Sequence, residues 1–369
     1  MGLNNLEERV ADAKGTVILD GSNGFSVIIL IPINVKAISA SSYIVMDTDT
    51  TRVLEGSNIH KKSLIASITK IMTTMVVINN TENLNVKKEM PEEILKSYGS
   101  GIYISVKEKL TTKELLYGLM LRSGNDAAIA LAVLTAGSME GFSKLMNETA
   151  NFLNMNDSSF INSHGLEEKD KANISTTYDM ALLSSYAIKN NVYKEITGTK
   201  EITVKSDIKT YLWHNKNRLL KEYKYCTGGK TGFTEKARRT LVTNASKNKV
   251  NLTVVTFNDG NDFNDHKELY EKYFKKLKNY KIVKKGKIKT NIDNTYIEES
   301  FNMSLTKEER KNIKVNINYY DTNVTNIVGN LTVTLNKKEY FKTNIIKKEN
   351  VKPKETFFQK LKRKILNLW

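Results

Sequence analysis

The chain has a single cysteine, Cys226, among its 369 residues. One cysteine excludes an intramolecular disulfide and leaves the redox compartment undetermined. No histidine lies near Cys226 in the sequence. We therefore interpret Cys226 as a small packed side chain and not as a catalytic thiol.

Motifs for metals and nucleic acids are also missing. The sequence has no zinc-ligand pattern, no Gly-rich phosphate loop and no interleaved aromatic and basic RNA-binding signature. We expect no metal, no cofactor and no nucleic-acid partner. Acidic residues are fewer than basic ones, 40 against 57, which gives a formal net charge of +17. This excess favours an anionic partner, such as a phospholipid surface or an acidic wall polymer, without choosing between them.

Long apolar runs are absent as well. The run over residues 25–35 is too short for an ordinary transmembrane helix, and small residues follow it at 37–40. This pattern is typical of a secretory signal, so we expect residues 1–40 to be a leader segment. The charged residues before this run are mostly acidic, which fits a signal poorly. Either the true start of the signal lies further along the chain, or the run is a buried strand.

A chain of 41.9 kDa with 40% hydrophobic residues can bury a sizeable core and form two domains. Residues 43–54 predict two short β segments around a turn. Apolar residues then recur at three- and four-residue spacing, so a helix begins close to Ser67. Residues 110–190 have a helical pattern. Strand-like runs return at 225–234, 240–244 and 250–257, before a helix over 267–277.

The C-terminal part has a different texture. Lys- and Asn-rich alternation predicts a separate small β domain over residues 282–352. Residues 353–369 predict a basic amphipathic helix. Its apolar face would hold Phe358, Leu361, Ile365 and Leu368. We expect this helix to bind an anionic membrane surface.

Three short motifs stand in one order along the chain: Ser67-Ile68-Thr69-Lys70, Ser123-Gly124-Asn125 and Lys230-Thr231-Gly232. A serine hydroxyl needs a base within hydrogen-bond reach, and a lysine can serve only if its pKa is lowered. Lys70 lies one helical turn after Ser67, where burial and the charge of Lys230 would favour the neutral amine. Backbone N–H groups at the helix start could receive an oxyanion.

Each motif alone has a structural explanation. Ser206, Ser246 and Ser304 also begin S-x-x-K patterns, so Lys70 by itself could be a solvated helix lysine. The second motif could be a helix-capping turn and the third a plain turn beside Gly228 and Gly229. However, the K-T-G triplet occurs once in the chain, and each motif is predicted to lie on the kind of element that its chemistry needs.

The motifs resemble those of low-molecular-mass penicillin-binding proteins, specifically serine-type D-alanyl-D-alanine carboxypeptidases. The resemblance covers roughly residues 40–350. It includes the loop over 162–166, the segment 179–181 and the approach to the third motif at 217–220. It implies an α+β fold with a β-lactamase/transpeptidase-like antiparallel sheet, flanking helices and a helical subdomain over residues 41–281. The small C-terminal β domain and the amphipathic tail helix would follow.

The resemblance also implies roles. Ser67 would be the acylated nucleophile and Lys70 its base, with Ser123 and Asn125 completing the centre. A second group of residues would bind the substrate. Lys230 and Thr231 would contact the terminal carboxylate, and Gly232 would let the peptide lie close to the strand. The backbone N–H groups of Phe233 and Ser67 would form the oxyanion hole, and Arg218 or Lys216 would add a further positive charge. His164 would be a structural loop residue.

The implied substrate is the peptidoglycan stem pentapeptide, which would lose its terminal D-alanine. β-Lactam antibiotics would be covalent inhibitors. The resemblance implies an exported bacterial protein on the outer face of the cytoplasmic membrane.

Two departures from the family pattern stand out. Ile65 replaces a proline, and Ala237-Arg238-Arg239-Thr240 replaces an Ala-Gly-x-Cys segment, so Arg238 stands where a glycine normally packs.

Three alternatives remain open. A class A β-lactamase is disfavoured because no E-x-x-L-N pattern lies between the second and third motifs. A transpeptidase would share the acylation half-reaction, and the sequence does not distinguish water from an amine as acceptor. A non-catalytic binder of anionic wall or membrane polymer would account for the charge alone.

Overall fold

The computed structural model describes residues 10, 16–20, 26–30, 38–320 and 326–348. The chain divides into two compact units, Met1–Ser39 and Ala40–Trp369. In the first unit, β1 (Thr16–Asp20) and β2 (Ser26–Leu30) form an antiparallel hairpin. Val27 and Ile29 are 37% and 41% exposed. The described part of the apolar run is therefore a strand on which Val27 and Ile29 are exposed, and the leader segment remains a prediction.

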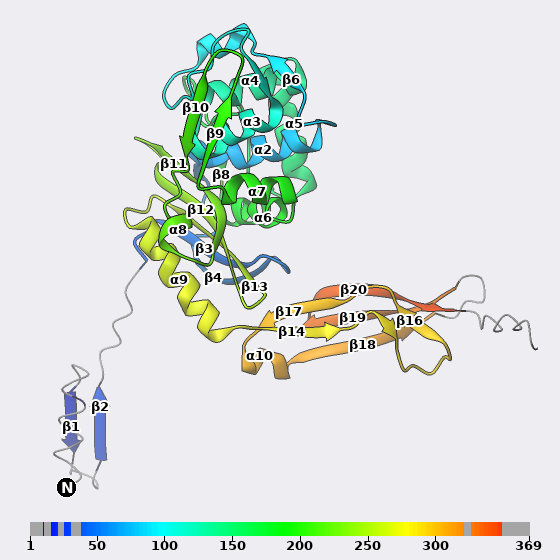
Figure 1. The fold of residues 1–369 in the computed structure, drawn as a ribbon. Helices are drawn as coiled ribbons and strands as arrows, with labels where there is room; N and C mark the ends of the chain where they lie inside the picture. The colour runs from blue at the N-terminus through cyan, green and yellow to red at the C-terminus, as the bar shows by residue number, and fades with distance from the viewer. Residues whose placement is uncertain (1–9, 11–15, 21–25, 31–37, 321–325, 349–369) are drawn as a thin grey trace, which may run out of the picture. The chain divides into compact units, whose positions relative to one another are not determined.

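The core of the second unit is a five-stranded antiparallel sheet with the order β11-β12-β13-β3-β4 (Figure 1). Its strands are β3 (Ser42–Asp47), β4 (Arg52–Ser57), β11 (Cys226–Thr234), β12 (Arg238–Lys247) and β13 (Val250–Phe257). The predicted hairpin over 43–54 and the three predicted strands after residue 225 are confirmed. The third motif lies on β11, an edge strand, so a bound peptide can approach it from outside the sheet.

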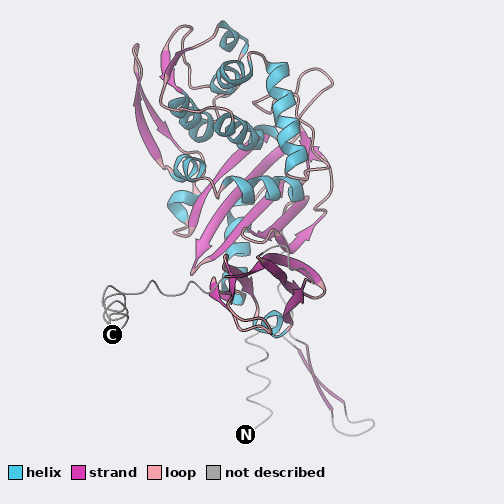
Figure 2. Ribbon diagram, turned by 90° about the vertical axis from the view of Figure 1, so that its right-hand side faces the viewer, coloured by secondary structure: helices cyan, strands magenta, loops and turns pink. Residues whose placement is uncertain are grey.

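Helices cover both faces of this sheet (Figure 2). Thr243 bonds Tyr270 on α9 (Asp262–Lys276), whereas its neighbour Asn244 accepts a hydrogen bond from Ser184 on α6 (Thr177–Ala187). Adjacent strand residues point to opposite faces, which places the two helices on opposite sides. The predicted start of α9 at residue 267 is wrong. The helix begins at Asp262 because two aspartates in its first turn interact favourably with the helix N-terminus.

A helical subdomain carries the first two motifs. Its elements are η1 (Ala66–Thr69), α2 (Lys70–Asn79), η2 (Glu92–Lys96), α3 (Thr112–Tyr117), the π-helical η3 (Gly118–Arg122), α4 (Asn125–Ala136) and α5 (Met139–Phe152). Apolar residues of α2, α3 and α4 form one buried core with those of the sheet. In the described part of the chain, no single helix is long and apolar enough to cross a membrane, although α4 and α5, bent by 85°, pass that test as a pair.

Short elements connect these parts. They are β5 (Ser63–Leu64), β6 (Lys87–Glu89), β7 (Lys109–Thr111), β8 (Ile174–Ser175), α7 (Asn191–Gly198), β9 (Glu201–Lys205), β10 (Thr210–His214) and α8 (Leu219–Glu222). The pairs β5–β8, β6–β7 and β9–β10 are antiparallel.

The region of the predicted C-terminal β domain consists mostly of strands, the first of which begins at Lys278, and its separation as a domain stays a prediction. It contains β14 (Lys278–Val283), β15 (Gly286–Lys287), β16 (Thr295–Ile297), β17 (Phe301–Leu305), α10 (Lys307–Lys311), β18 (Ile313–Tyr319), β19 (Ile327–Leu335) and β20 (Lys338–Lys347). It has a hydrophobic cluster of its own that includes Leu331, Val333 and Ile345. The predicted tail helix over 353–369 lies outside the described residues.

Candidate active site

The first motif lies where η1 passes into α2. Ala66, directly before Ser67, has a φ of +49°, and such a left-handed residue costs on the order of 1–3 kcal/mol. Gly165 has a φ of +89°, and a Cβ there would lie 2.0 Å from Ala66 O. The loop over 162–166 therefore presses its backbone against the turn that carries Ser67, which only glycine permits.

Lys70 is fully buried and its amine contacts the Ser67 hydroxyl. Lys70 Nζ lies 3.1 Å from Ser67 Oγ, 2.8 Å from Asn125 Oδ1 and 2.7 Å from His164 O. The amide oxygen and the carbonyl can only accept hydrogen bonds. A neutral amine that donates its two protons to them keeps its lone pair for the Ser67 hydroxyl.

The surroundings of Lys70 favour that neutral amine. Burial lowers its pKa well below the ordinary lysine value, and the positive charges of Lys230 and Lys216 lower it further, against the opposing charge of Asp126. Burial, helped by Lys216, also lowers the pKa of Lys230 to about 7. Desolvation and nearby like charge are the two causes that produce a lysine base at neutral pH.

The second motif lies between η3 and α4. Ser123 has a φ of +65° and ends the π-helical turn, while Asn125 is the first residue of α4. Asn125 Nδ2 donates to Tyr98 O over 2.6 Å, which turns the amide oxygen toward Lys70. Asp126 accepts backbone N–H groups of Ile102 and Tyr103 at 3.0 Å and 2.6 Å. These bonds fix the loop that brings Ser100 to the site.

The third motif lies on β11 beside Ser67. A Cβ on Gly232 would be 3.1 Å from the backbone nitrogens of both Ser67 and Ile68. The absence of a side chain there leaves the Ser67 N–H accessible. Phe233 follows on the same strand, so its backbone N–H is the second candidate donor for an oxyanion.

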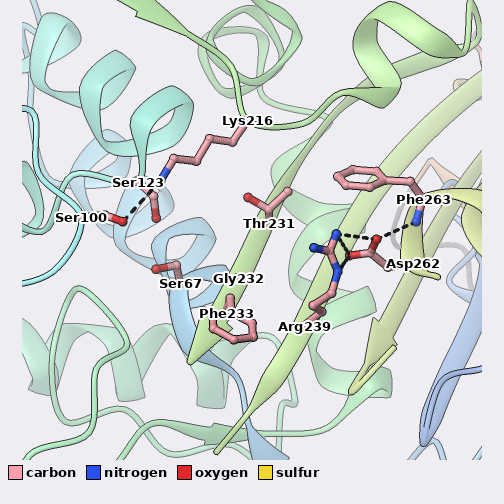
Figure 3. Close-up of a pocket in the computed structure, with 10 residues that line it drawn as sticks. All are labelled: Ser67, Ser100, Ser123, Lys216, Thr231, Gly232, Phe233, Arg239, Asp262 and Phe263. Atoms are coloured by element: carbon pink, nitrogen blue, oxygen red, sulfur yellow. Dashed lines mark hydrogen bonds and ion pairs between the residues drawn. The ribbon is translucent and has the colours of Figure 1, made fainter. Parts of the chain in front are cut away.

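A cavity of about 350 Å³ opens at the point where the three motifs meet. It is lined by Ser67, Ser100, Ser123, Lys216, Thr231, Gly232, Phe233, Arg239, Asp262 and Phe263 (Figure 3). Five of the nine predicted site residues therefore line one pocket, and three of the other four, Lys70, Asn125 and Lys230, are buried.

Arg218 is placed differently from these residues. Its guanidinium carbon lies 4.5 Å from the Phe263 ring centroid, its Nε pairs with Glu222 at 3.5 Å, and it is not among the residues that line the pocket. Lys216, the other predicted source of positive charge, does line it.

Sequence reasoning missed Ser100, Arg239, Asp262 and Phe263 as pocket residues. Asp262 could have been predicted, because a correct start for α9 brings the first turn of that helix close to Arg239, near the first residue of β12. Ser100 had no comparable signal, since its carbonyl accepts the Asn125 N–H and Asp126 holds the residues that follow it, Ile102 and Tyr103.

His164 and Cys226 have structural surroundings. Burial, together with the charge of Lys70, lowers the pKa of His164 to about 3, and its carbonyl holds Lys70. Burial raises the pKa of the Cys226 thiol to about 11. Neither pKa suits a nucleophile or base at neutral pH. Among the described residues, no group of three or more His, Cys, Asp or Glu side chains could hold a metal ion.

Comparison with known proteins agrees with this geometry. A family model described as D-alanyl-D-alanine carboxypeptidase matches residues 31–261. The D-alanyl-D-alanine carboxypeptidase DacF of Bacillus subtilis (strain 168) is 34% identical over 223 residues, which cover 59% of this chain and 57% of that protein. The aligned region thus spans little more than half of that relative.

Solved structures are similar over longer stretches. A D-alanyl-D-alanine carboxypeptidase from Mycobacterium tuberculosis H37Rv has a TM-score of 0.62 at 26% identity, covering 66% of this chain and 95% of that one. Penicillin binding protein 5 from Haemophilus influenzae has a TM-score of 0.71 at 21% identity, covering 84% and 96%. These likenesses confirm the predicted fold class. The family match over more than half of the sequence shows that this chain belongs to the D-alanyl-D-alanine carboxypeptidase family.

Proposed function

We propose that the protein is a serine-type D-alanyl-D-alanine carboxypeptidase that removes the terminal D-alanine from peptidoglycan stem pentapeptides. The observation that carries the proposal is the 3.1 Å contact between Lys70 Nζ and Ser67 Oγ. The amine in this contact is fully buried beside a second lysine that lowers its pKa. A solvated helix lysine would have neither property.

Acylation follows from these positions. Neutral Lys70 takes the proton of Ser67 as Oγ attacks the carbonyl carbon of the penultimate D-alanine. The negative charge that develops on the carbonyl oxygen is stabilised by the N–H groups of Ser67 and Phe233. The C–N bond then breaks, and Ser123 passes the proton from Lys70 to the departing D-alanine amine. Water hydrolyses the Ser67 ester, with Lys70 again as base.

The test is release of D-alanine from an N-acyl-L-Lys-D-Ala-D-Ala tripeptide, with Ser67→Ala as the matched control. We expect turnover by the parent chain and none by Ser67→Ala. A non-catalytic binder of wall or membrane polymer would release no D-alanine in either form. An added amine acceptor addresses the transpeptidase alternative. If the parent forms more transfer product than free acid, it is a transpeptidase of the same acyl-enzyme type.

We further propose that the protein is exported and acts on the outer face of the cytoplasmic membrane, held there by its C-terminal helix. The apolar residues named above would enter the lipid interface. Lys360, Lys362, Arg363 and Lys364 would meet anionic headgroups, each worth about 1 kcal/mol near such a surface. Deleting residues 356–369 should release the protein from anionic vesicles while penicillin acylation continues. Equal sedimentation of the truncated and full chains with vesicles would exclude the tail as the anchor.

A further inference from the structure

A peptide that ends in a free carboxylate needs a cation within the pocket. The sequence pointed to Lys230 for this role, beside Thr231. However, Lys230 is 1% exposed, its Nζ donates to Thr231 O over 2.6 Å, and it is not among the residues that line the pocket. Two cations do line the pocket, Lys216 and Arg239.

Arg239 is held by a buried carboxylate. Its Nε and Nη2 donate to Asp262 over 2.8–3.1 Å, and the Asp262 side chain is only 4% exposed. Asp262 is fixed in turn, because the Phe263 N–H donates to its Oδ1 over 2.8 Å. One edge of the guanidinium is therefore anchored, while the Arg239 side chain remains 45% exposed toward the pocket.

The open edge of this guanidinium lies on the Thr231 side. Arg239 is directly opposite Phe233 in the β11–β12 register, and Thr231 points to the same sheet face two residues before Phe233. In Figure 3, the guanidinium nitrogen without a dashed line is the one on the side of Thr231. Lys216 reaches in from the opposite wall and donates to Ser100 Oγ over 3.3 Å.

We propose that Arg239, positioned by Asp262, binds the terminal carboxylate of the stem peptide together with the Thr231 hydroxyl, and that Lys230 acts on Lys70 instead. This inference rests on the proposed carboxypeptidase function. A planar guanidinium suits the role, because it can satisfy Asp262 along one edge and offer further N–H donors to a second carboxylate. A lysine has no such second edge.

The test compares two substrates, N-acyl-L-Lys-D-Ala-D-Ala and its C-terminal amide, in the full chain and its variants. The measured quantity is the ratio of kcat/KM for acid to kcat/KM for amide. Arg239→Lys keeps the positive charge and loses the planar guanidinium with its several N–H donors. The double variant Arg239→Gln with Asp262→Asn avoids leaving Asp262 buried without its cation. Both should lower the ratio by about 10- to 100-fold, the range for a lost charge-assisted hydrogen bond.

Two further variants separate Arg239 from its neighbours. Lys230→Gln should slow both substrates and keep the ratio, because it disturbs the base that both reactions use. Arg238→Lys is the matched control: it is the adjacent, exposed arginine and does not line the pocket, so its ratio should equal that of the parent.

An unchanged ratio in both Arg239 variants would overturn the inference. If the acid-to-amide ratio falls in Lys216→Ala or Lys230→Gln and not in the Arg239 variants, the inference is also overturned, because another cation then binds the carboxylate. A parent ratio near one would show that no carboxylate is recognised. Failure of the proposed function would look different, because neither substrate would then turn over and penicillin would leave Ser67 unmodified.

Discussion

Gly232→Ala is a direct test of the oxyanion hole. A Cβ at this position would lie 2.4 Å from Thr240 Oγ1 and 3.1 Å from the backbone nitrogens of Ser67 and Ile68. The Thr240 hydroxyl donates to Ile65 O over 3.0 Å, so it cannot turn away without losing that bond. The added methyl group therefore forces β11 away from the turn that carries Ser67.

The expected cost follows from what this displacement removes. Loss of one oxyanion donor costs about 2.7–4 kcal/mol, or roughly 10²–10³-fold in rate. Overpacking adds about 1–3 kcal/mol of lost stability. We expect the rate of acylation by penicillin to fall by about 10²-fold or more, with a lowered melting temperature. The assay is stopped-flow acylation together with thermal unfolding of the same samples.

Gly260→Ala is the matched control, because no heavy atom lies within 4 Å of a Cβ built there. It should acylate at the parental rate. A double variant, Gly232→Ala with Thr240→Ala, removes the 2.4 Å contact and keeps the 3.1 Å contacts with the two nitrogens. It should regain stability without regaining rate. If the acylation rate of Gly232→Ala lies within a few-fold of the parental rate, the absence of a side chain at Gly232 is not needed to keep the oxyanion hole open.

Four further predictions concern the base and the stability of the fold. Acylation needs neutral Lys70, so its rate should fall as pH falls through the lowered Lys70 pKa. Lys230→Gln removes a positive charge and so raises the pKa of Lys70, which should move the acidic limb of the pH–rate profile to higher pH. An acidic limb at the parental pH would mean that Lys230 does not act on Lys70. Lys70→Arg, which cannot deprotonate, should acylate far more slowly than the parent, and a parental rate would exclude Lys70 as the base. Arg238→Gly should raise stability by about 1 kcal/mol, or roughly 3 °C in melting temperature, because Arg238 has a φ of +58° that glycine adopts without strain; a lower melting temperature would contradict this. Asn173→Ala should cost about 2–4 kcal/mol in urea unfolding, because this residue is only 2% exposed and bonds Thr69 Oγ1 at 3.1 Å and Asn162 O at 2.9 Å; a loss below about 1 kcal/mol would show that the network tolerates the gap.

The elements that the sequence predicts well are those with local signals. The spacing of apolar residues after Ser67 indicates α2, and the apolar run over 250–257 coincides with β13 (Val250–Phe257). The start of α9 was missed, because its first turn holds polar residues whose favourable interaction is with the helix terminus and not with a core.

The candidate site divides in the same way. The three motifs identify Ser67, Lys70 and Lys230 because each role needs a particular residue type at a particular spacing. Contacts between distant segments carry no such pattern. The bond from Lys70 to His164 O spans 94 residues and involves a backbone atom, so no side chain marks it. The Arg239–Asp262 pair forms only when β12 and α9 pack together.

The central claim is that Ser67 forms the acyl-enzyme with Lys70 as its base. Peptide mapping by mass spectrometry after penicillin treatment tests it most directly. We expect a stoichiometric adduct on the peptide that contains Ser67, and none in Ser67→Ala. An adduct on another serine, or no adduct on the folded parent chain, would contradict it.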